Sequence, residues 1–359
     1  MKKSAYKQGM LLLLPLLFSS LTLTGQEVTK EFHEEYTAGA NTTLQISNKY
    51  GDVIVDSWDQ DQIVIDVKVT VELPSREKAE RLIDYINVEF SQDGDLITAK
   101  TVIDDKFNFS GWGGSSKRFS IDYSVKMPAK TALNLSNRYG NADIDELNGL
   151  VDIDIKYGNF TIGKITRGND KPINHINLAY GKGSIDEAGW LDLVIRYAGN
   201  TEIQKCQALL LDSKYSKLAV GEISSIVGES KYDNMNIEEI NNLVLDNGYT
   251  EVKIGTLRKK LEYSGSYGSF SINYIPAGFE SIDVDTKYMG VNLGIDDNAN
   301  YNLEAHVSYG GLKYNDNNFV NKRRIIENNS QEIAGTVGDE NTNSSVNVRA
   351  SYGSVRLYQ

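Results

Sequence analysis

The chain has 359 residues and a formal net charge of −12, with 24% charged and 40% hydrophobic residues and a single cysteine. These values exclude collagen-like, disulfide-rich and fully disordered proteins, and the acidic charge argues against nucleic-acid binding. Tyrosine outnumbers phenylalanine by 21 to 10, which indicates that the aromatic residues do more than fill an ordinary core.

Residues 1–25 have the features of a secretory signal peptide. They combine a lysine-rich start, an apolar run from Met10 to Phe18, and a small and polar stretch that ends at Gly25. The apolar run is shorter than the ~20 residues of a transmembrane helix, and no later segment of the sequence comes close to that length. We expect cleavage between Gly25 and Gln26 and an exported protein, located in the periplasm, at the outer surface or in the medium; a buried N-terminal strand is the alternative.

Residues 26–130 predict an N-terminal β-rich flank that covers the first unit of the array described below. The alternating run from Ile63 to Val71 predicts a long strand. A short helix is expected at about residues 75–87, with Ser75 as N-cap and an apolar stripe of Ala79, Leu82, Ile83 and Ile86. Residues 104–118 form a Gly and Ser loop whose Phe107, Phe109 and Trp112 either fold back on the body or form a binding tip.

Residues 131–359 predict an array of short repeats. Each unit alternates apolar and polar residues, reaches a tyrosine that is usually followed by glycine, and resumes with apolar residues three and five positions later. Successive tyrosines from Tyr139 to Tyr309 lie 17 to 23 residues apart, a period typical of stacked coils. The expected tyrosine ladder comprises Tyr139, Tyr157, Tyr180, Tyr197, Tyr215, Tyr232, Tyr249, Tyr267, Tyr288, Tyr309 and Tyr352, and Tyr50 marks an isolated earlier unit.

The alternation assigns sides to each strand, since residues i and i+2 share a face. Leu133 and Leu135 share the parity of Tyr139, so the tyrosines are expected to face inward, with a corner at the following glycine. On this interpretation Tyr232→Ala would leave a cavity and cost about 3 kcal/mol or more. An Asn-rich loop insertion is expected at residues 313–345.

Three segments carry a resemblance to a known family: LQISNKYGDVIV near the start, IDYSVKMPAKTALNLSNRYGNADI in the middle, and EIAGTVG followed by VNVRASYGSVRLY at the end. The chain resembles the putative-adhesin β-strand-repeat domain family of bacterial envelope proteins over nearly all of residues 30–359. The resemblance implies a right-handed parallel β-solenoid of about 18 residues per coil and an envelope location. It supplies no catalytic residues.

The single residues with catalytic or ligand chemistry give little support for an enzyme. His33, His175 and His306 lie on well-separated units, so a shared metal is not expected. Cys206 cannot form an internal disulfide, and we expect it to be a small buried or half-buried residue. No G-x-S-x-G elbow, complete dinucleotide-binding motif or P-loop is present.

Two sets of carboxylates are candidates for binding or catalysis. Asp212, Glu229 and Asp246 precede their tyrosines by three residues and so form a column, which either binds Ca²⁺ or is neutralised by neighbouring lysines at positions 214 and 231. The pairs Asp152 with Asp154 and Asp283 with Asp285 place carboxylates on one face about 6.6 Å apart, within the range of inverting glycosidases. Such pairs also arise on any solvated strand that alternates Asp with apolar residues.

The sequence therefore predicts a non-enzymatic exported envelope protein without a cofactor, an adhesin or scaffold whose polar faces or loops bind a protein or glycan. Two alternatives remain: a periplasmic sensor or accessory in envelope homeostasis, and a carbohydrate-active β-helix enzyme. A groove with clustered Asp, Arg and Lys would favour the enzyme, and a smooth polar face would favour the scaffold.

Overall fold

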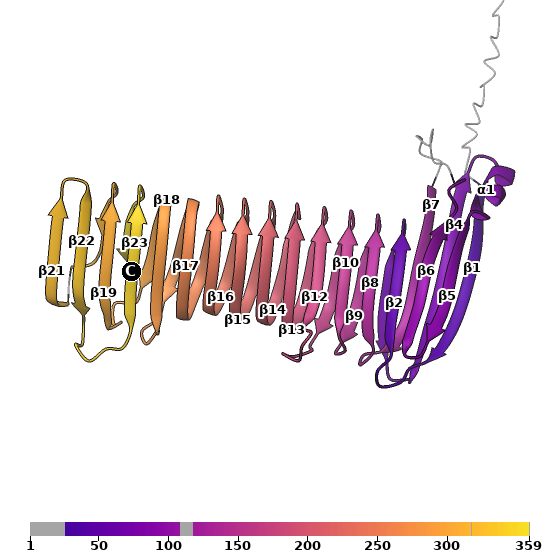
Figure 1. Cartoon of the computed structure of the whole chain (residues 1–359), viewed down its shortest axis with the longest axis horizontal. Coiled ribbons are helices and arrows are strands. Elements are labelled where there is room, and N and C mark those ends of the chain that lie inside the picture. Colours follow the sequence, from indigo (N-terminus) through magenta and orange to yellow (C-terminus); the bar gives the residue numbers. More distant parts are fainter. Residues whose placement is uncertain (1–25, 108–117, 317, 359) are drawn as a thin grey trace, which may run out of the picture.

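The computed structural model describes residues 26–107, 118–316 and 318–358, so the predicted signal peptide lies outside the described residues. Within that part of the chain the secondary structure is nearly all strand, with one helix, which confirms the all-β class. The strands lie side by side along an elongated body, with β21 at one end and β1 at the other (Figure 1). No helix of the described residues is long and apolar enough to cross a membrane.

Each repeat consists of a leading strand before the tyrosine and a trailing strand after it. The trailing strand begins two to four residues after the tyrosine, except at Tyr267 and Tyr288, where the strand is continuous. In the first units the two are separate elements: leading β2 (Thr43–Lys49), β8 (Ala132–Arg138), β10 (Val151–Lys156) and β12 (Asn174–Ala179), and trailing β3 (Val53–Trp58), β9 (Ala142–Leu147) and β11 (Phe160–Ile165). In the following units the trailing strand of one unit continues into the leading strand of the next, as β13 (Gly183–Arg196), β14 (Thr201–Lys214), β15 (Lys217–Lys231) and β16 (Asn234–Gly248). β17 (Glu251–Ile275) and β18 (Ser281–Ile295) also run through their tyrosines, Tyr267 and Tyr288.

Equivalent strands of neighbouring units pair in parallel and in register, so leading and trailing segments form two separate columns. The leading column continues from β2 through β8, β10 and β12 into β13. The trailing column runs from β3 through β9 and β11 into β13. Because every unit needs its neighbours to pair its backbone and bury its side chains, the units are stable only as a stack.

The last unit of the chain does not lie last in the stack. Its strands β23 (Ser345–Ser351) and β24 (Val355–Tyr358) pair with β18 on one side and with β19 (Tyr301–Ser308) and β20 (Leu312–Lys313) on the other. The unit of Tyr352 therefore sits between those of Tyr288 and Tyr309. The units therefore do not all stack in chain order.

The N-terminal end of the body is built from antiparallel strands. β1 (Gln26–Thr37) pairs with β4 (Gln62–Leu73), and β4 pairs with β7 (Arg118–Pro128), which joins the trailing column beside β3. β5 (Ile86–Asp93) pairs with β6 (Leu96–Ile103), which joins the leading column beside β2. The unit of Tyr50 is thus part of the stack, next to the unit of Tyr139.

The helix is shorter than predicted. α1 spans Arg76–Ile83, Ser75 makes no side-chain capping hydrogen bond, and Ile86 already belongs to β5. Ala79 and Ile83 are buried against the end of the core, as the apolar stripe requires. Tertiary packing of one face, with a weak N-cap, explains why only two turns form.

The expected loop insertion at residues 313–345 is wrong, because most of it forms a β-hairpin. β21 (Phe319–Glu327) and β22 (Ser330–Val337) pair antiparallel, and β22 adds antiparallel to β19. The leading column therefore gains two strands at its C-terminal end.

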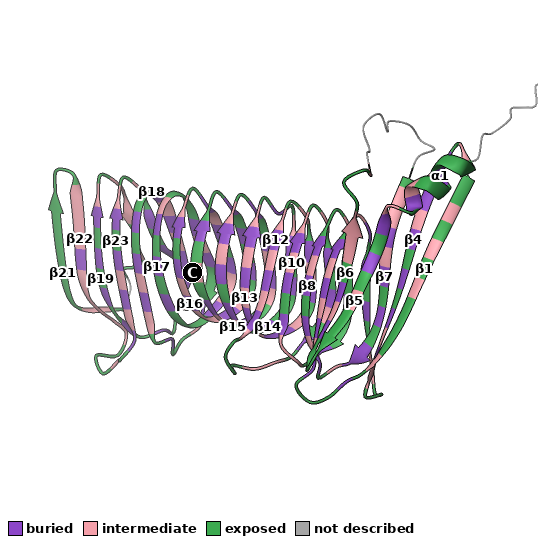
Figure 2. Cartoon of the chain, turned by 45° about the vertical axis from the view of Figure 1, so that its right-hand side comes forward, coloured by how far each residue is buried: buried purple, intermediate pink, exposed green. Residues whose placement is uncertain are grey.

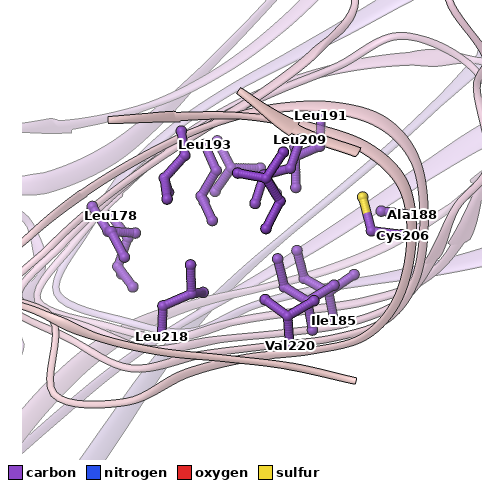
Figure 3. Packing of buried hydrophobic residues seen from close by; sticks show 14 of the residues in the cluster. Leu178, Ile185, Ala188, Leu191, Leu193, Cys206, Leu209, Leu218 and Val220 are labelled. Atoms are coloured by element: carbon purple, nitrogen blue, oxygen red, sulfur yellow. The ribbon is translucent and has the colours of Figure 1, made fainter. Parts of the chain in front are cut away.

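The core lies between the two columns. Leu178, Leu191, Leu193 and Leu209 from leading strands point towards Ile185, Leu218 and Val220 from trailing strands, with Ala188 and Cys206 at one side (Figure 3). Buried and exposed residues alternate along the strands (Figure 2). The polar outward residues of the leading column form a long face, which we call the leading face.

Candidate functional site

The ladder tyrosines lie at the corners between leading and trailing strands, and the prediction that they face inward is wrong. All twelve, from Tyr50 to Tyr352, have positive φ, between 51° and 70°. Alternation of sides holds only while the backbone stays extended, and the left-handed conformation turns the tyrosine outward. At the position two residues before the tyrosine the strand is still extended and the side chain points inward, as the alternation predicts. The buried residues at this position include Asn137, Ser213, Ser230 and Asn247.

The outward tyrosines stack into one ridge along the body. Neighbouring ring centroids are 4.8 to 5.1 Å apart, with interplanar angles of 1° to 15°, from Tyr50 through Tyr288 to Tyr352 and finally Tyr309. Phe119 lies beside Tyr50 at 5.0 Å and extends the ridge. From Tyr139 onward, the exposed fraction of the ladder tyrosines ranges from 42% at Tyr288 to 57% at Tyr309. Because the ring faces cover one another, the ridge presents ring edges and hydroxyls to solvent.

The glycine after the tyrosine is required by contact between units and not by its own φ. A Cβ on Gly158 would lie 1.9 Å from the carbonyl oxygen of Gly140, and a Cβ on Gly140 would lie 1.9 Å from that of Gly51. In the middle units Ala198, Ser216, Asp233 and Thr250 take this position and are buried. Asp233 there accepts hydrogen bonds from the Ser216 amide at 2.7 Å and the Ser230 hydroxyl at 2.6 Å.

A basic column runs beside the ridge on the leading face. The residue before the tyrosine is basic in seven units: Lys49, Arg138, Lys156, Arg196, Lys214, Lys231 and Lys287. Three of the ammonium groups lie over the neighbouring ring, Lys49 at 4.7 Å, Lys156 at 5.5 Å and Lys287 at 5.7 Å from the centroids. The charge of this column contrasts with the acidic net charge of the chain.

The next column of the leading face brings Asp212, Glu229 and Asp246 into register on adjacent strands. Arg196 forms an ion pair with Asp212, and Lys231 lies 3.8 Å from Glu229. The expected neutralising role of Lys214 thus belongs to Arg196, which comes from the preceding unit. Within the described ranges no group of three His, Cys, Asp or Glu residues is arranged to hold a metal ion. The lysine and arginine partners explain how the like charges coexist.

The same column leads into a groove of about 330 Å³ over β16, β17, β18 and β23. Four carboxylates, an amide and a guanidinium line it: Asp246, Glu262, Asp283, Asp285, Asn347 and Arg349. Asn347 donates a hydrogen bond to Asp283 at 2.8 Å, and Arg349 lies directly opposite Asp285 in the strand pairing. Such a set can accept and donate hydrogen bonds to a polar ligand and attract a cationic group.

An apolar strip borders this groove. Leu210 and Val227 are 43% and 47% exposed on the leading face, and the strand pairing continues their row to Val244, which lines the groove. The leading face therefore offers apolar and charged contacts side by side, as binding surfaces do.

Sequence reasoning found part of this groove. It identified Asp246 and the pair Asp283 and Asp285, but it missed Arg349 and Asn347, because the C-terminal unit inserts out of chain order. The other predicted pair faces different partners: Asp152 lies opposite His175, and Asp154 accepts a hydrogen bond from Asn177 at 3.3 Å.

The histidines lie apart, on different parts of the body. His33 contacts Asp66 at 2.6 Å and Glu35 at 3.1 Å, and hydrogen bonds to these carboxylates raise its pKa above 6.5. His175 lies 3.0 Å from Asp192, and His306 lies opposite Arg349.

Cys206 is a buried free thiol, as expected, and burial raises its pKa to about 12. Phe107 packs edge-on against Phe119 at 5.3 Å, so this ring folds back on the body. Phe109 and Trp112 lie outside the described residues.

Two exposed pairs near the trailing strands also have shifted pKa values. The hydrogen bond from Arg258 to Glu239, at 2.6 Å, lowers the pKa of that carboxyl group. The hydrogen bond from Tyr274 to Asp296, also at 2.6 Å, lowers the pKa of Asp296 and raises that of Tyr274. Neither pair lies in the groove.

No family model matches the chain, and no curated protein matches it. Solved structures that match over most of its length include a putative adhesin from Parabacteroides merdae, at 11% identity, covering 92% of this chain and 97% of that one with a TM-score of 0.31. A putative cell adhesion protein from Clostridium sporogenes matches at 9% identity, covering 92% and 100% of the two chains with a TM-score of 0.20. A putative lipid binding protein from Parabacteroides distasonis matches at 12% identity, covering 92% and 97% with a TM-score of 0.26.

A putative adhesin and a putative cell adhesion protein thus occur among the similar solved structures. Because the identities and TM-scores are this low, no ligand or partner carries over from these proteins.

Proposed function

We propose that this chain is an exported, non-enzymatic protein of the bacterial envelope, an adhesin or scaffold that binds a glycan or protein through its leading face. In this proposal the two strand columns form a right-handed parallel solenoid. The protein works in the periplasm or at the outer surface.

The groove carries the proposal. It gathers four carboxylates, an amide and a guanidinium from four adjacent strands and continues into exposed Leu210 and Val227. Polar groups that converge beside apolar surface are typical of ligand sites. Because these groups sit on paired strands and not on loops, their spacing is fixed before a ligand arrives, which lowers the entropic cost of binding.

The tyrosine ridge supports the same function by holding the face rigid. Apart from Tyr309, which stacks on Tyr352 alone in the described residues, each ladder ring packs between two other rings and so braces the corner of its unit against the neighbouring units. Its hydroxyls and the adjacent basic column add donors along the whole body.

A carbohydrate-active enzyme is the second candidate, and the groove is the observation that favours it. Asp283 and Asp285 lie on one face of β18, and most glycoside hydrolases use such a pair of carboxyl groups. Arg349 lies opposite Asp285 in the strand pairing. In this function one carboxyl group would protonate the glycosidic oxygen while the other activates water.

A glycan array tests whether the protein binds glycans through the groove. We expect wild-type protein to bind a subset of glycans, and the variant Asp285→Asn with Arg349→Ala to bind them at least tenfold more weakly. The matched control, Asp152→Asn with Asp154→Asn, changes two carboxylates of the same face outside the groove and should bind normally. No binding by wild-type protein to glycans or to envelope protein extracts, or equal binding by the groove variant, would overturn the proposal.

Release of reducing ends from the bound glycans separates the two candidates. Hydrolysis that disappears in Asp283→Asn and Asp285→Asn would establish the enzyme. Binding without product at long incubation supports the adhesin or scaffold.

A further inference from the structure

The strand array has an open edge at each end within the described residues. At the C-terminal end β21 pairs with β22 alone. At the N-terminal end β5 pairs with β6 alone and β1 with β4 alone. Open edges expose backbone N–H and C=O groups that can pair with a strand of another chain.

The two ends carry opposite charge. β21 contains Lys322, Arg323 and Arg324, all exposed, in a chain whose net charge is −12. Lys322 and Arg323 form ion pairs with Asp316 and Glu332, whereas Arg324 has no ion-pair partner in the described part of the chain. The N-terminal edges carry exposed carboxylates at Glu27, Glu31, Glu34 and Glu35 on β1 and at Glu89 and Asp93 on β5.

The basic end also exposes apolar surface. Ile325 and Ile326 are 40% and 58% exposed. The pairing of β21 with β22 sets Ile326 opposite Gln331 and Arg324 opposite Ile333. Since Ile333 is buried, Ile326 lies on the core-facing side of the hairpin, where no described strand covers it.

The directions and positions of the end strands fit one another. β21 and β5 both end the leading column, so they would meet if a second copy continued the stack. β21 runs in the same direction as the leading strands, because two antiparallel pairings separate it from β19. β5 runs in the opposite direction to β6, which is parallel to β2, so β21 and β5 would pair antiparallel.

At each end of the body one of the two strand columns extends further than the other, and the protruding column differs between the two ends. At the C-terminal end the leading column extends two strands past β19, while the trailing column stops at the two-residue strand β20. At the N-terminal end the trailing column extends three strands past β3, through β7, β4 and β1, one more than the leading column, which extends through β6 and β5 past β2. The protruding hairpin of one copy can therefore lie beside the protruding β1 of the next.

We propose that this surface takes a second copy of the chain, joined head to tail: β21 of one copy adds to β5 of the next, with the acidic β1 facing the basic hairpin. Such a contact is heterologous, because two different surfaces meet, and it repeats without closing. Successive copies would build a linear filament in which the leading faces form one extended binding surface.

Sedimentation velocity of the purified protein tests the proposal. At low salt the mean sedimentation coefficient should rise with protein concentration, and the association should weaken at least tenfold between ~20 mM and ~0.5 M salt, because screening acts on exposed charges. If the wild-type protein stays monomeric at ~100 µM in low salt, the inference is overturned. The charges on the end strands would then serve to prevent pairing with other chains.

Two variants locate the contact. Ile326→Glu adds a charge at an exposed position of β21 and should weaken association at least tenfold while leaving the melting temperature unchanged. The control Leu210→Glu changes an apolar residue in the middle of the body that is 43% exposed, against 58% for Ile326, and should associate as wild type. Association that survives Ile326→Glu, or that is lost in Leu210→Glu, would place the contact elsewhere.

A charge exchange tests the pairing of the two ends. One variant carries Lys322→Glu, Arg323→Glu and Arg324→Glu; the other carries Glu31→Lys, Glu89→Lys and Asp93→Lys. Each alone has two ends of like charge and should remain monomeric, whereas an equimolar mixture should associate again. A mixture that stays monomeric although both variants melt cooperatively would contradict the head-to-tail contact.

Discussion

Replacing one ladder tyrosine tests both the left-handed corner and the value of stacking. Tyr232 has φ of 60°, is 48% exposed, and lies 4.8 Å from the rings of Tyr215 and Tyr249. Burial of about half the ring, ~100 Å², contributes about 2.5 kcal/mol at 25 cal/mol/Å², and each stacked contact adds about 0.5 to 1.5 kcal/mol. Since alanine keeps a small part of this, Tyr232→Ala should lower the free energy of unfolding by about 3 to 5 kcal/mol.

At the same position we expect a glycine variant to be more stable than an alanine variant, which is the reverse of the usual order in a strand. An L-residue in the left-handed region costs about 1 to 2 kcal/mol, while glycine loses about 0.5 to 1 kcal/mol more conformational entropy on folding. Tyr232→Gly should therefore be more stable than Tyr232→Ala, by up to about 1.5 kcal/mol. Tyr232→Phe keeps the ring in place and should lie within about 0.5 kcal/mol of wild type.

Urea-induced unfolding followed by circular dichroism measures this series. Tyr263 is a matched control, because it is buried and accepts a hydrogen bond from Asn247 at 2.6 Å. Tyr263→Phe leaves that amide unsatisfied and should cost about 1 to 3 kcal/mol. A variant Tyr232→Ala as stable as Tyr232→Gly or more so would refute the left-handed corner, and a loss below about 0.5 kcal/mol would refute the contribution of the ladder.

Three further predictions concern single residues. Gly158→Ala should destabilise the protein by about 1 to 3 kcal/mol through its clash with the preceding unit, whereas Gly168→Ala, with nothing within 4 Å of its Cβ, should be neutral in a thermal melt. Cys206, whose pKa burial raises to about 12, should react with a thiol reagent at about pH 8 only after unfolding, and rapid labelling of folded protein would contradict its burial. His33 should titrate by NMR with a pKa above 6.5, and Asp66→Asn should lower that pKa. The contact of protonated His33 with Asp66 stabilises the fold fully below pH 6.5, and this stabilisation is lost as the pH rises through the pKa of His33 in the folded protein. An unchanged pKa in Asp66→Asn would rule out the Asp66 hydrogen bond as the main cause.

The period of the tyrosines was enough to predict an all-β stack, because a constant spacing of units reflects a repeated need to bury one small apolar set. Alternation correctly assigned Leu133 and Leu135 to the core. The alternation assigned Tyr139 to the wrong side, because it predicts the direction of a side chain only while the backbone is extended, and the backbone of Tyr139 is left-handed.

The groove could be predicted only in part, for a topological reason. Asp246 and Asp285 lie near one another in the order of the units, but Arg349 reaches them only because β23 inserts beside β18. An insertion of this kind depends on long-range pairing, which local patterns do not encode. The hairpin of β21 and β22 was missed because the turn and flanks of segment 313–345 are Asn-rich, and this composition outweighed the few apolar residues of the two strands. The pairing of β22 with β19 could not be read from the local pattern.

Accessibility on intact cells tests most directly whether the protein is exported and presents a binding surface. An epitope placed between Asn169 and Asp170, which are both exposed, would be digested by added protease on whole cells or only after the outer membrane is opened, with a periplasmic protein as control. The account predicts export: digestion on whole cells with the control protected indicates an adhesin, and digestion only on opening indicates a periplasmic scaffold. An epitope that remains protected after the outer membrane is opened, until the cells are lysed, would contradict it.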